Sequence, residues 1–224
     1  MKKYKPAGGS IGIPAIWIIK PNGEQAHFQS GAGKFVETLN KFSKELTKAV
    51  VSTKRIGLMK SAAKEADAFL EQGKFVSAYE QLSDYAEDLK TDNKALSKVK
   101  ATFKKIEDAA LEKIDSAQDL VEKGLSEAKR FDGAFQLTVI AGSMKDLESV
   151  NEKAEAAIKR LKAESKFAEL FKQASEFYAA REAAKEEDTA KAKKLYEKVI
   201  ADFKGTEVAK RAKAKLEELK AADE

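Results

Sequence analysis

The distribution of proline constrains the fold of this chain more than any other feature. All three prolines, Pro6, Pro14 and Pro21, lie near the start, and none occurs between Pro21 and residue 224. Because proline inside a helix removes a backbone hydrogen bond and clashes with the preceding turn, its absence from so long a stretch permits helices throughout. The stretch is also rich in Ala, Leu, Lys and Glu, which favour helix. The sequence therefore predicts a mainly α-helical fold after about residue 34.

Apolar side chains recur at helical spacing in four parts of this stretch. The four stripes are Phe75, Ala78, Tyr79, Leu82, Ala86 and Leu89; Leu96, Val99, Phe103, Ile106, Ala110 and Ile114; Leu147, Val150, Ala154, Ile158 and Leu161; and Leu195, Val199 and Phe203. Gly73, Gly124 and Gly205 are expected to end helices, since glycine adopts the left-handed conformation common there. Neither glycine nor proline occurs in residues 95–123 or 146–186, so both stretches are compatible with helices that continue without a break.

The first 33 residues have a different composition, with all the prolines and six of the twelve glycines. Residues 15–19 are a β-branched and aromatic run, which is typical of a strand. Pro21, Asn22 and Gly23 form a strong turn signal, and residues 24–30 then alternate in polarity. We therefore predict a β-hairpin here, followed by an amphipathic helix that begins near Lys34.

The charge pattern favours an exposed helical surface. Lys and Arg number 42 against 37 Asp and Glu, and the two signs are interleaved along the predicted helices. The basic residues are not gathered with aromatics, so no nucleic-acid partner is expected. No apolar run approaches the roughly 18 residues that a membrane span needs, and the run at residues 11–19 is too short for a signal peptide. We expect a soluble protein.

The absence of cysteine excludes several kinds of chemistry. The chain supplies no thiol nucleophile, no disulfide and no zinc ligand of the cysteine type. His27 is the only histidine and is interpreted as a surface or strand-edge residue rather than a metal ligand. We therefore expect a chain that is itself non-catalytic and that binds neither a metal nor a cofactor.

Other candidate sites have simpler structural explanations. Trp17 is expected to pack in a core rather than to stack on a ligand. The glycine-rich residues 8–12 lack the Gly-Lys-Ser/Thr ending of a phosphate loop, and residues 31–34 are interpreted as a helix entry rather than an anion site. The paired carboxylates, Glu186 with Glu187 and Glu217 with Glu218, are typical of a solvated helix face.

A cluster of aromatic side chains falls within one predicted helix. Its members are Phe167, Phe171, Phe177 and Tyr178. A core position is favoured for them, and a groove that binds a peptide is the alternative.

A faint internal repeat runs through the helical region. Phe75, Ala78 and Tyr79 recur as Phe131, Ala134 and Phe135, a spacing of 56 positions, and Ala192 falls at the corresponding place of a weaker third copy. We interpret residues 51–224 as an array of helical units that stack through their alanine faces.

The helical units resemble tetratricopeptide repeats. The segment that begins at Gly73 is similar to the Gly-x-aromatic-x-x-Ala motif of that family, in which a small alanine lets paired helices approach closely. Residues 192–209 look like the repeat variant common in bacterial cell-envelope proteins. The spacing of 56 exceeds the family period of about 34 residues, so longer helices are expected. The resemblance implies a surface for a protein or peptide partner.

Residues 1–50 resemble the C-terminal half of a thioredoxin fold. Gly12, Ile13, Pro14 and Ala15, followed by the hairpin and the helix from Lys34, are similar to that family's cis-proline loop, strands and last helix. The resemblance implies that Ile13 and Pro14 contact substrate and that the Ile13–Pro14 bond is cis. The Cys-x-x-Cys half of the fold has no counterpart in this chain. If a signal peptide lies upstream, a bacterial periplasm or cell envelope is implied.

Two functions follow from these patterns. The first is a non-catalytic protein-interaction module, in which a helical repeat scaffold is attached to a truncated thioredoxin-like segment. The second is the C-terminal portion of a thiol–disulfide oxidoreductase whose catalytic half is missing from this chain. The reading frame upstream of Met1 distinguishes them, because the oxidoreductase requires a Cys-x-x-Cys segment there.

We predict that the chain alone does not catalyse thiol–disulfide exchange, because the reaction requires a thiolate and no cysteine is present. Turbidity from insulin reduction by dithiothreitol should develop at the same rate with and without the protein. Thioredoxin is the positive control, and any acceleration by this chain above the uncatalysed rate would refute the prediction.

Overall fold

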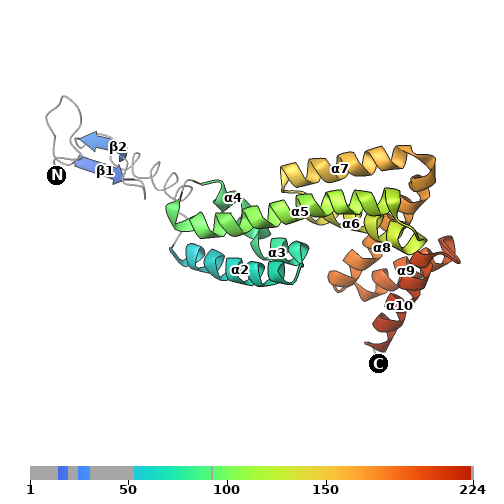
Figure 1. The fold of residues 1–224 in the computed structure, drawn as a ribbon. Helices are drawn as coiled ribbons and strands as arrows, with labels where there is room; N and C mark the ends of the chain where they lie inside the picture. The colour runs from blue at the N-terminus through green and yellow to red at the C-terminus, as the bar shows by residue number, and fades with distance from the viewer. Residues whose placement is uncertain (1–14, 20–24, 31–52, 92, 223–224) are drawn as a thin grey trace.

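The computed structural model describes residues 15–19, 25–30, 53–91 and 93–222, and this part of the chain is mainly α-helical, as predicted. Figure 1 shows the helices in chain order from α2 to α10. The described helices are α2 (Thr53–Glu71), α3 (Phe75–Leu82), α4 (Ala86–Leu89), α5 (Ser97–Lys123), α6 (Glu127–Ser143), α7 (Glu148–Ala163), α8 (Ser165–Lys185), α9 (Thr189–Asp202) and α10 (Glu207–Ala221), with short 3₁₀ turns η2 (Ser83–Tyr85) and η3 (Lys94–Leu96).

Two short strands precede the helices. β1 (Ala15–Ile19) pairs with β2 (Gln25–Ser30) in an antiparallel register that places Trp17 opposite Phe28 and Ile18 opposite His27. The remainder of the predicted thioredoxin-like segment, including Pro14 and its predicted cis bond, lies outside the described residues.

Glycine ends helices at the three positions that the sequence indicates. Gly73 follows α2 with φ +71° and Gly205 lies between α9 and α10 with φ +86°, so both adopt a backbone conformation that side chains disfavour. Gly124 forms the C-cap of α5, and its N–H donates to the carbonyl of Leu120. The uninterrupted helix expected within residues 95–123 is confirmed by α5.

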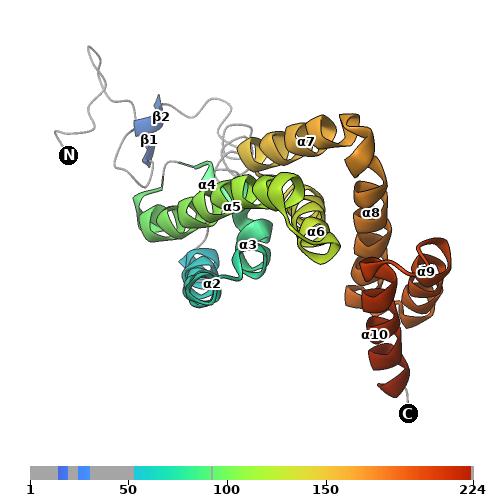
Figure 2. The same ribbon diagram turned by 45° about the vertical axis from the view of Figure 1, so that its right-hand side comes forward.

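Three breaks were not expected from the sequence. The stripe over residues 75–89 is divided among α3, η2 and α4, residues 146–186 are divided at Glu164, and Glu187 turns the chain before α9 with φ 60°. Residues 146–186 are therefore not one continuous helix, although the sequence is compatible with one. Residues six apart point about 120° away from each other on a continuous helix. The extended backbone at Glu164 redirects α8 (Figure 2), so that both Leu161 and Phe167 are buried.

The long helices make their substantial contacts with close neighbours in the chain. α5 packs against α6 and α7, α6 against α7 and α8, and α8 against α9 and α10. α2 and α3 pack against each other and against α5. Among the described helices, two contacts join partners further apart in the chain: α6 packs against α10, and Lys185 on α8 bonds to Glu80 on α3. Successive contacts between close neighbours are typical of α-helical solenoids.

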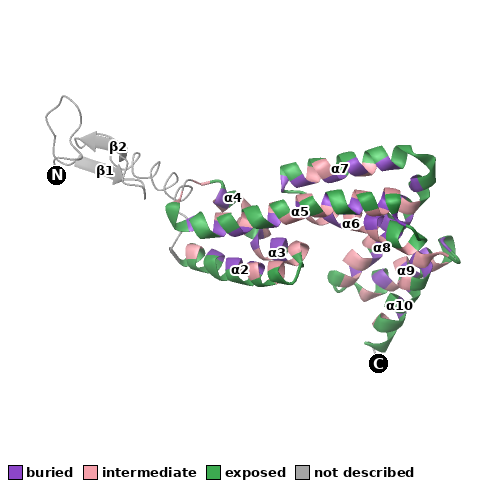
Figure 3. Cartoon of the chain, viewed as in Figure 1, coloured by how far each residue is buried: buried purple, intermediate pink, exposed green. Residues whose placement is uncertain are grey.

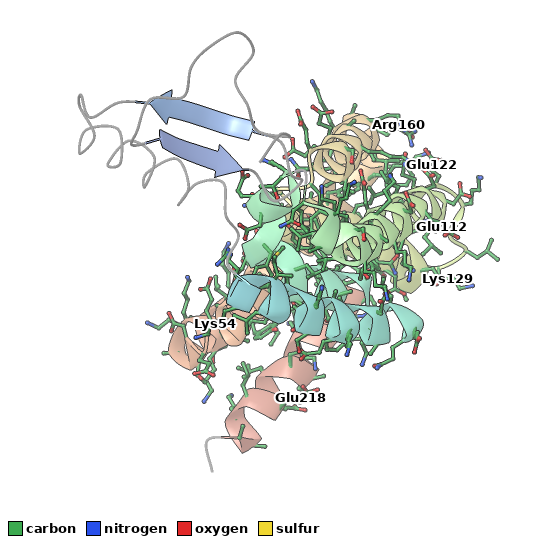
Figure 4. All side chains as sticks on the ribbon, turned by 90° about the vertical axis from the view of Figure 1, so that its left-hand side faces the viewer. Lys54, Glu112, Glu122, Lys129, Arg160 and Glu218 are labelled. Atoms are coloured by element: carbon green, nitrogen blue, oxygen red, sulfur yellow. The ribbon has the colours of Figure 1, made fainter. Side chains whose placement is uncertain are left out.

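Polar pairs align α7 with α5. Arg160 Nη1 lies 2.6 Å from Glu122 Oε1, and these two side chains are labelled in Figure 4. Ser149 Oγ donates to Glu107 nearer the start of both helices. The residue numbers of the paired positions increase in the same direction on both helices, from Glu107 and Ser149 to Glu122 and Arg160. Helices α5 and α7 therefore run parallel. Exposed pairs of this kind contribute only about 0–1 kcal/mol each, so they define the alignment more than the stability.

Buried residues line the faces where helices meet, whereas the outward faces are exposed (Figure 3). The repeated alanines Ala78, Ala134 and Ala192 lie on α3, α6 and α9 and are all fully buried. Each follows a turn that joins two antiparallel helices, α2 to α3, α5 to α6, and α8 to α9. A leucine at Ala78 or Ala134 would overpack these contacts, at a cost of about 1–3 kcal/mol.

Gly133 marks a close approach of α6 to α5, because an added Cβ would lie 2.5 Å from the carbonyl oxygen of Ala117 and 2.9 Å from Leu120 Cβ. We expect Gly133→Ala to lower the free energy of unfolding by about 1–3 kcal/mol. Gly57→Ala is the control, since Gly57 lies on α2 with nothing within 4 Å of the added carbon. This variant should be stabilised by up to about 1 kcal/mol through helix propensity.

Urea denaturation followed by far-UV circular dichroism measures both changes. Equal stability of Gly133→Ala and the parent protein would contradict the close packing of α5 and α6.

Candidate functional site

The site residues implied by the thioredoxin resemblance, Ile13 and Pro14, lie outside the described residues. Glu186, Glu187, Glu217 and Glu218 are all exposed, as predicted. Glu217 and Glu218 lie on α10, whereas Glu186 and Glu187 lie in the turn that follows α8 rather than on a helix. The glycine-rich residues 8–12 and residues 31–34 also lie outside the described residues.

The aromatic cluster of α8 is mostly core. Phe167, Phe171 and Phe177 are buried, as predicted, whereas Tyr178 is half-buried and its hydroxyl lies 3.2 Å from Ser143 Oγ on α6. Burial raises the pKa of the Tyr178 phenol more than any neighbouring charge does, so this hydroxyl is protonated at neutral pH. Phe177 also lines a pocket.

This pocket is the candidate functional site. It has a volume of about 480 Å³ and lies where α6, α8, α9 and α10 meet. It is lined by Phe135, Phe177, Arg181, Ala184, Lys185, Tyr196, Lys215, Glu218 and Leu219. The pocket therefore requires α6 to pack against the three consecutive helices α8, α9 and α10.

Aromatic rings form the apolar wall of the pocket. The centroids of Phe135 and Phe177 are 5.2 Å apart in an edge-to-face arrangement, and Tyr196 meets Phe177 in the same way at 5.7 Å. Behind them, Phe131 stacks on Phe135 at 5.8 Å. These geometries are favourable for aromatic pairs, and together the rings form an apolar surface.

Two lysines at the rim have carboxylate partners within the chain. Lys185 Nζ lies 2.8 Å from Glu80 on α3 and 3.6 Å from Glu182, one turn away on α8. Lys215 Nζ lies 2.5 Å from Glu218 on α10, which is labelled in Figure 4. The positive charges of both lysines are therefore compensated within the protein.

Arg181 differs from these lysines. Its guanidinium lies over the ring of Phe135, 5.7 Å from the centroid, and it makes no ion pair or hydrogen bond with any residue that the structure describes. Arg211 on α10 provides the comparison, since it lies in the same way over Phe131 at 5.1 Å. Arg211 also reaches Asp132 at 2.6 Å and Glu207 at 3.1 Å. Of these two ring-stacked arginines, Arg181 is the one without a carboxylate.

Sequence reasoning did not identify Arg181 as a site residue. A usable signal was present, because Arg181 follows Phe177 by four positions and therefore shares a helix face with it. The contributions of Phe135, Tyr196 and Leu219 had no comparable local signal, since they depend on how four helices pack.

The described residues provide no other obvious chemistry. Among residues 53–91 and 93–222, no three His, Asp or Glu side chains are grouped so as to hold a metal ion. None of the helices described there is long and apolar enough to cross a membrane.

Comparison of the chain with protein-family models, with curated proteins and with solved structures finds no match. The thioredoxin-like and tetratricopeptide-like resemblances therefore rest on the sequence motifs alone.

The difference between the two arginines can be tested by stability measurements. We expect Arg211→Met to lower the free energy of unfolding by about 0.5–1 kcal/mol more than Arg181→Met, because Arg211 alone loses carboxylate partners while both lose a ring contact. Urea denaturation of the two variants side by side measures this difference. Equal losses would show that the ion pairs of Arg211 make no net contribution.

Proposed function

We propose that this chain is a non-catalytic protein-interaction module, a helical repeat scaffold attached to a truncated thioredoxin-like segment. The observation that carries the proposal is the pocket between α6, α8, α9 and α10, with aromatic walls and a charged rim. Pockets that combine a large apolar surface with a few polar groups are the usual binding sites of proteins.

The arrangement of the helices supports the same proposal. Contacts that run from each helix to the next and the one after generate an extended surface rather than a closed core. Extended surfaces of this type bind segments of other proteins, and the tetratricopeptide-like motifs at Gly73 and residues 192–209 point to the same class of function.

The types of residue at the pocket add further support. Tyr and Arg carry a disproportionate share of binding energy at protein interfaces, and Tyr196 and Arg181 both line the pocket. Arg181 already lies over the ring of Phe135, so part of its side-chain freedom is lost before a partner binds. A partner side chain would gain most of its binding energy from this wall.

The second candidate function is the C-terminal portion of a thiol–disulfide oxidoreductase whose catalytic half is missing from this chain. It is favoured by the motif around Ile13 and Pro14, which resembles the substrate-contacting loop of the thioredoxin family. In that case the helical array would be an accessory domain, and a periplasmic or cell-envelope location would follow from the family. A Cys-x-x-Cys segment encoded upstream of Met1 would favour this function.

We expect the pocket to be required for peptide binding. Random peptides displayed on phage are selected on the immobilised full chain, and the enriched peptides are tested against two variants of α8. Ala184→Glu places a charged side chain in the pocket, whereas Ala179→Glu makes the same change at an exposed position of the same helix. Peptides should lose binding to Ala184→Glu and retain it with Ala179→Glu.

Circular dichroism and thermal unfolding confirm that both variants are folded before binding is compared. Selection that enriches no peptide above an unrelated helical protein, or peptides that bind Ala184→Glu as well as the parent, would overturn the proposed function of this pocket.

A further inference from the structure

Comparison of the two ring-stacked arginines, Arg181 and Arg211, shows that in the described part of the chain the pocket lacks a carboxylate beside Arg181. Arg211 over Phe131 has Asp132 and Glu207 as partners, whereas Arg181 over Phe135 has no carboxylate partner among the described residues. Both rings belong to α6, four residues apart, so the two sites have the same construction except for the missing carboxylate. A guanidinium that is held against an aromatic ring is already positioned to donate hydrogen bonds to a carboxylate.

The described carboxylates near the rim are paired with lysines rather than with Arg181. Glu218 is the one acidic residue that lines the pocket, and it lies 2.5 Å from Lys215. Glu182 is directed to Lys185, as is Glu80 from α3. Of the three cations that line the pocket, Arg181 is therefore the one without a carboxylate partner among the described residues.

The apolar wall lies directly beside this charge. Arg181 contacts the ring of Phe135, which in turn meets Phe177 at 5.2 Å. Leu219 and Ala184 extend the apolar lining. A group that binds here therefore needs an apolar body and an adjacent negative charge.

From these observations we infer that the pocket binds an acidic peptide segment, in which a large apolar side chain enters against Phe135, Phe177 and Tyr196 while a neighbouring Asp or Glu pairs with Arg181. This inference rests on the proposed function and specifies the chemistry of its partner. The pairing would use the planar guanidinium to bind both carboxylate oxygens.

The charges at the rim match a peptide better than they match other ligands that carry a carboxylate or a phosphate. Beyond the apolar wall, the rim presents both signs of charge through Lys185, Lys215 and Glu218, which suits a chain with polar groups on either side of its apolar residue. A nucleic acid would instead require a row of cations free to contact phosphates, and here both lysines have carboxylate partners.

The test uses fluorescein-labelled synthetic peptides and the full chain, with binding measured by fluorescence anisotropy. One peptide carries Phe followed by Asp within a Gly/Ser background, a second carries Asn in place of the Asp, and a third carries Lys. We expect the Asp peptide to bind about tenfold more tightly than the Asn peptide, and this preference to decrease as salt is added. The Lys peptide should bind most weakly.

Variants at the two arginines locate the effect. Arg181→Met should remove the preference for Asp over Asn, and Arg181→Glu should reverse the preference in favour of Lys. Arg211→Met is the matched control, because it removes a ring-stacked arginine outside the pocket lining, and it should retain the preference. Circular dichroism confirms that each variant is folded.

Several results would overturn the inference. Equal affinity for the Asp and Asn peptides, with binding still lost in Ala184→Glu, would leave the proposed function intact and exclude acidic selectivity. The same conclusion follows if phage selection enriches binders without acidic residues and the Asp peptide does not bind. Displacement of the Asp peptide by sodium octanoate at a lower concentration than by unlabelled peptide would assign the pocket to small amphipathic carboxylates, and displacement by single-stranded DNA would assign it to nucleic acid.

Discussion

The packing of α6 on α5 is the contact on which the other helices depend. Gly133 lies so close to the carbonyl of Ala117 that no side chain could occupy its position, and Ala134 beside it is fully buried. The axes of two helices can approach in this way only where side chains are absent or small. α6 in turn contacts α7, α8 and α10, so its position on α5 determines where the second half of the array begins.

The break at Glu164 then determines the direction of the C-terminal helices. If α7 and α8 were one straight helix, the apolar faces around Leu161 and Phe167 could not both be buried against the array. The change of direction brings α8 across α6, where Tyr178 packs against Gly142 and Phe177 meets Phe135. The pocket beside Arg181 is a consequence of this crossing, because α9 and α10 close its remaining sides.

Parts of this arrangement could be predicted from the sequence because they depend on local signals. Helix α5 follows from an apolar stripe without glycine or proline, and the ends at Gly73 and Gly205 follow from a residue that adopts positive φ without strain. The breaks at Glu164 and Glu187 had no such signal, since glutamate is an ordinary helix former. Tertiary packing decides these positions. The pocket was missed for the same reason, because Phe135 and Leu219 meet only after four helices are placed.

The contact between α6 and α10 has a mechanical consequence. A chain whose helices touch only their near neighbours opens one unit at a time when its ends are pulled apart, because each unit is held by one interface. Here Arg211 bonds to Asp132 at 2.6 Å, and the Glu207 backbone N–H donates to Glu127 at 3.1 Å. These bonds fasten the last helix to the middle of the array, so tension must shear α10 from α6 before α8 and α9 can separate. Lys185 on α8 bonds to Glu80 on α3 at 2.8 Å, so the first helical hairpin is also linked directly to the C-terminal helices.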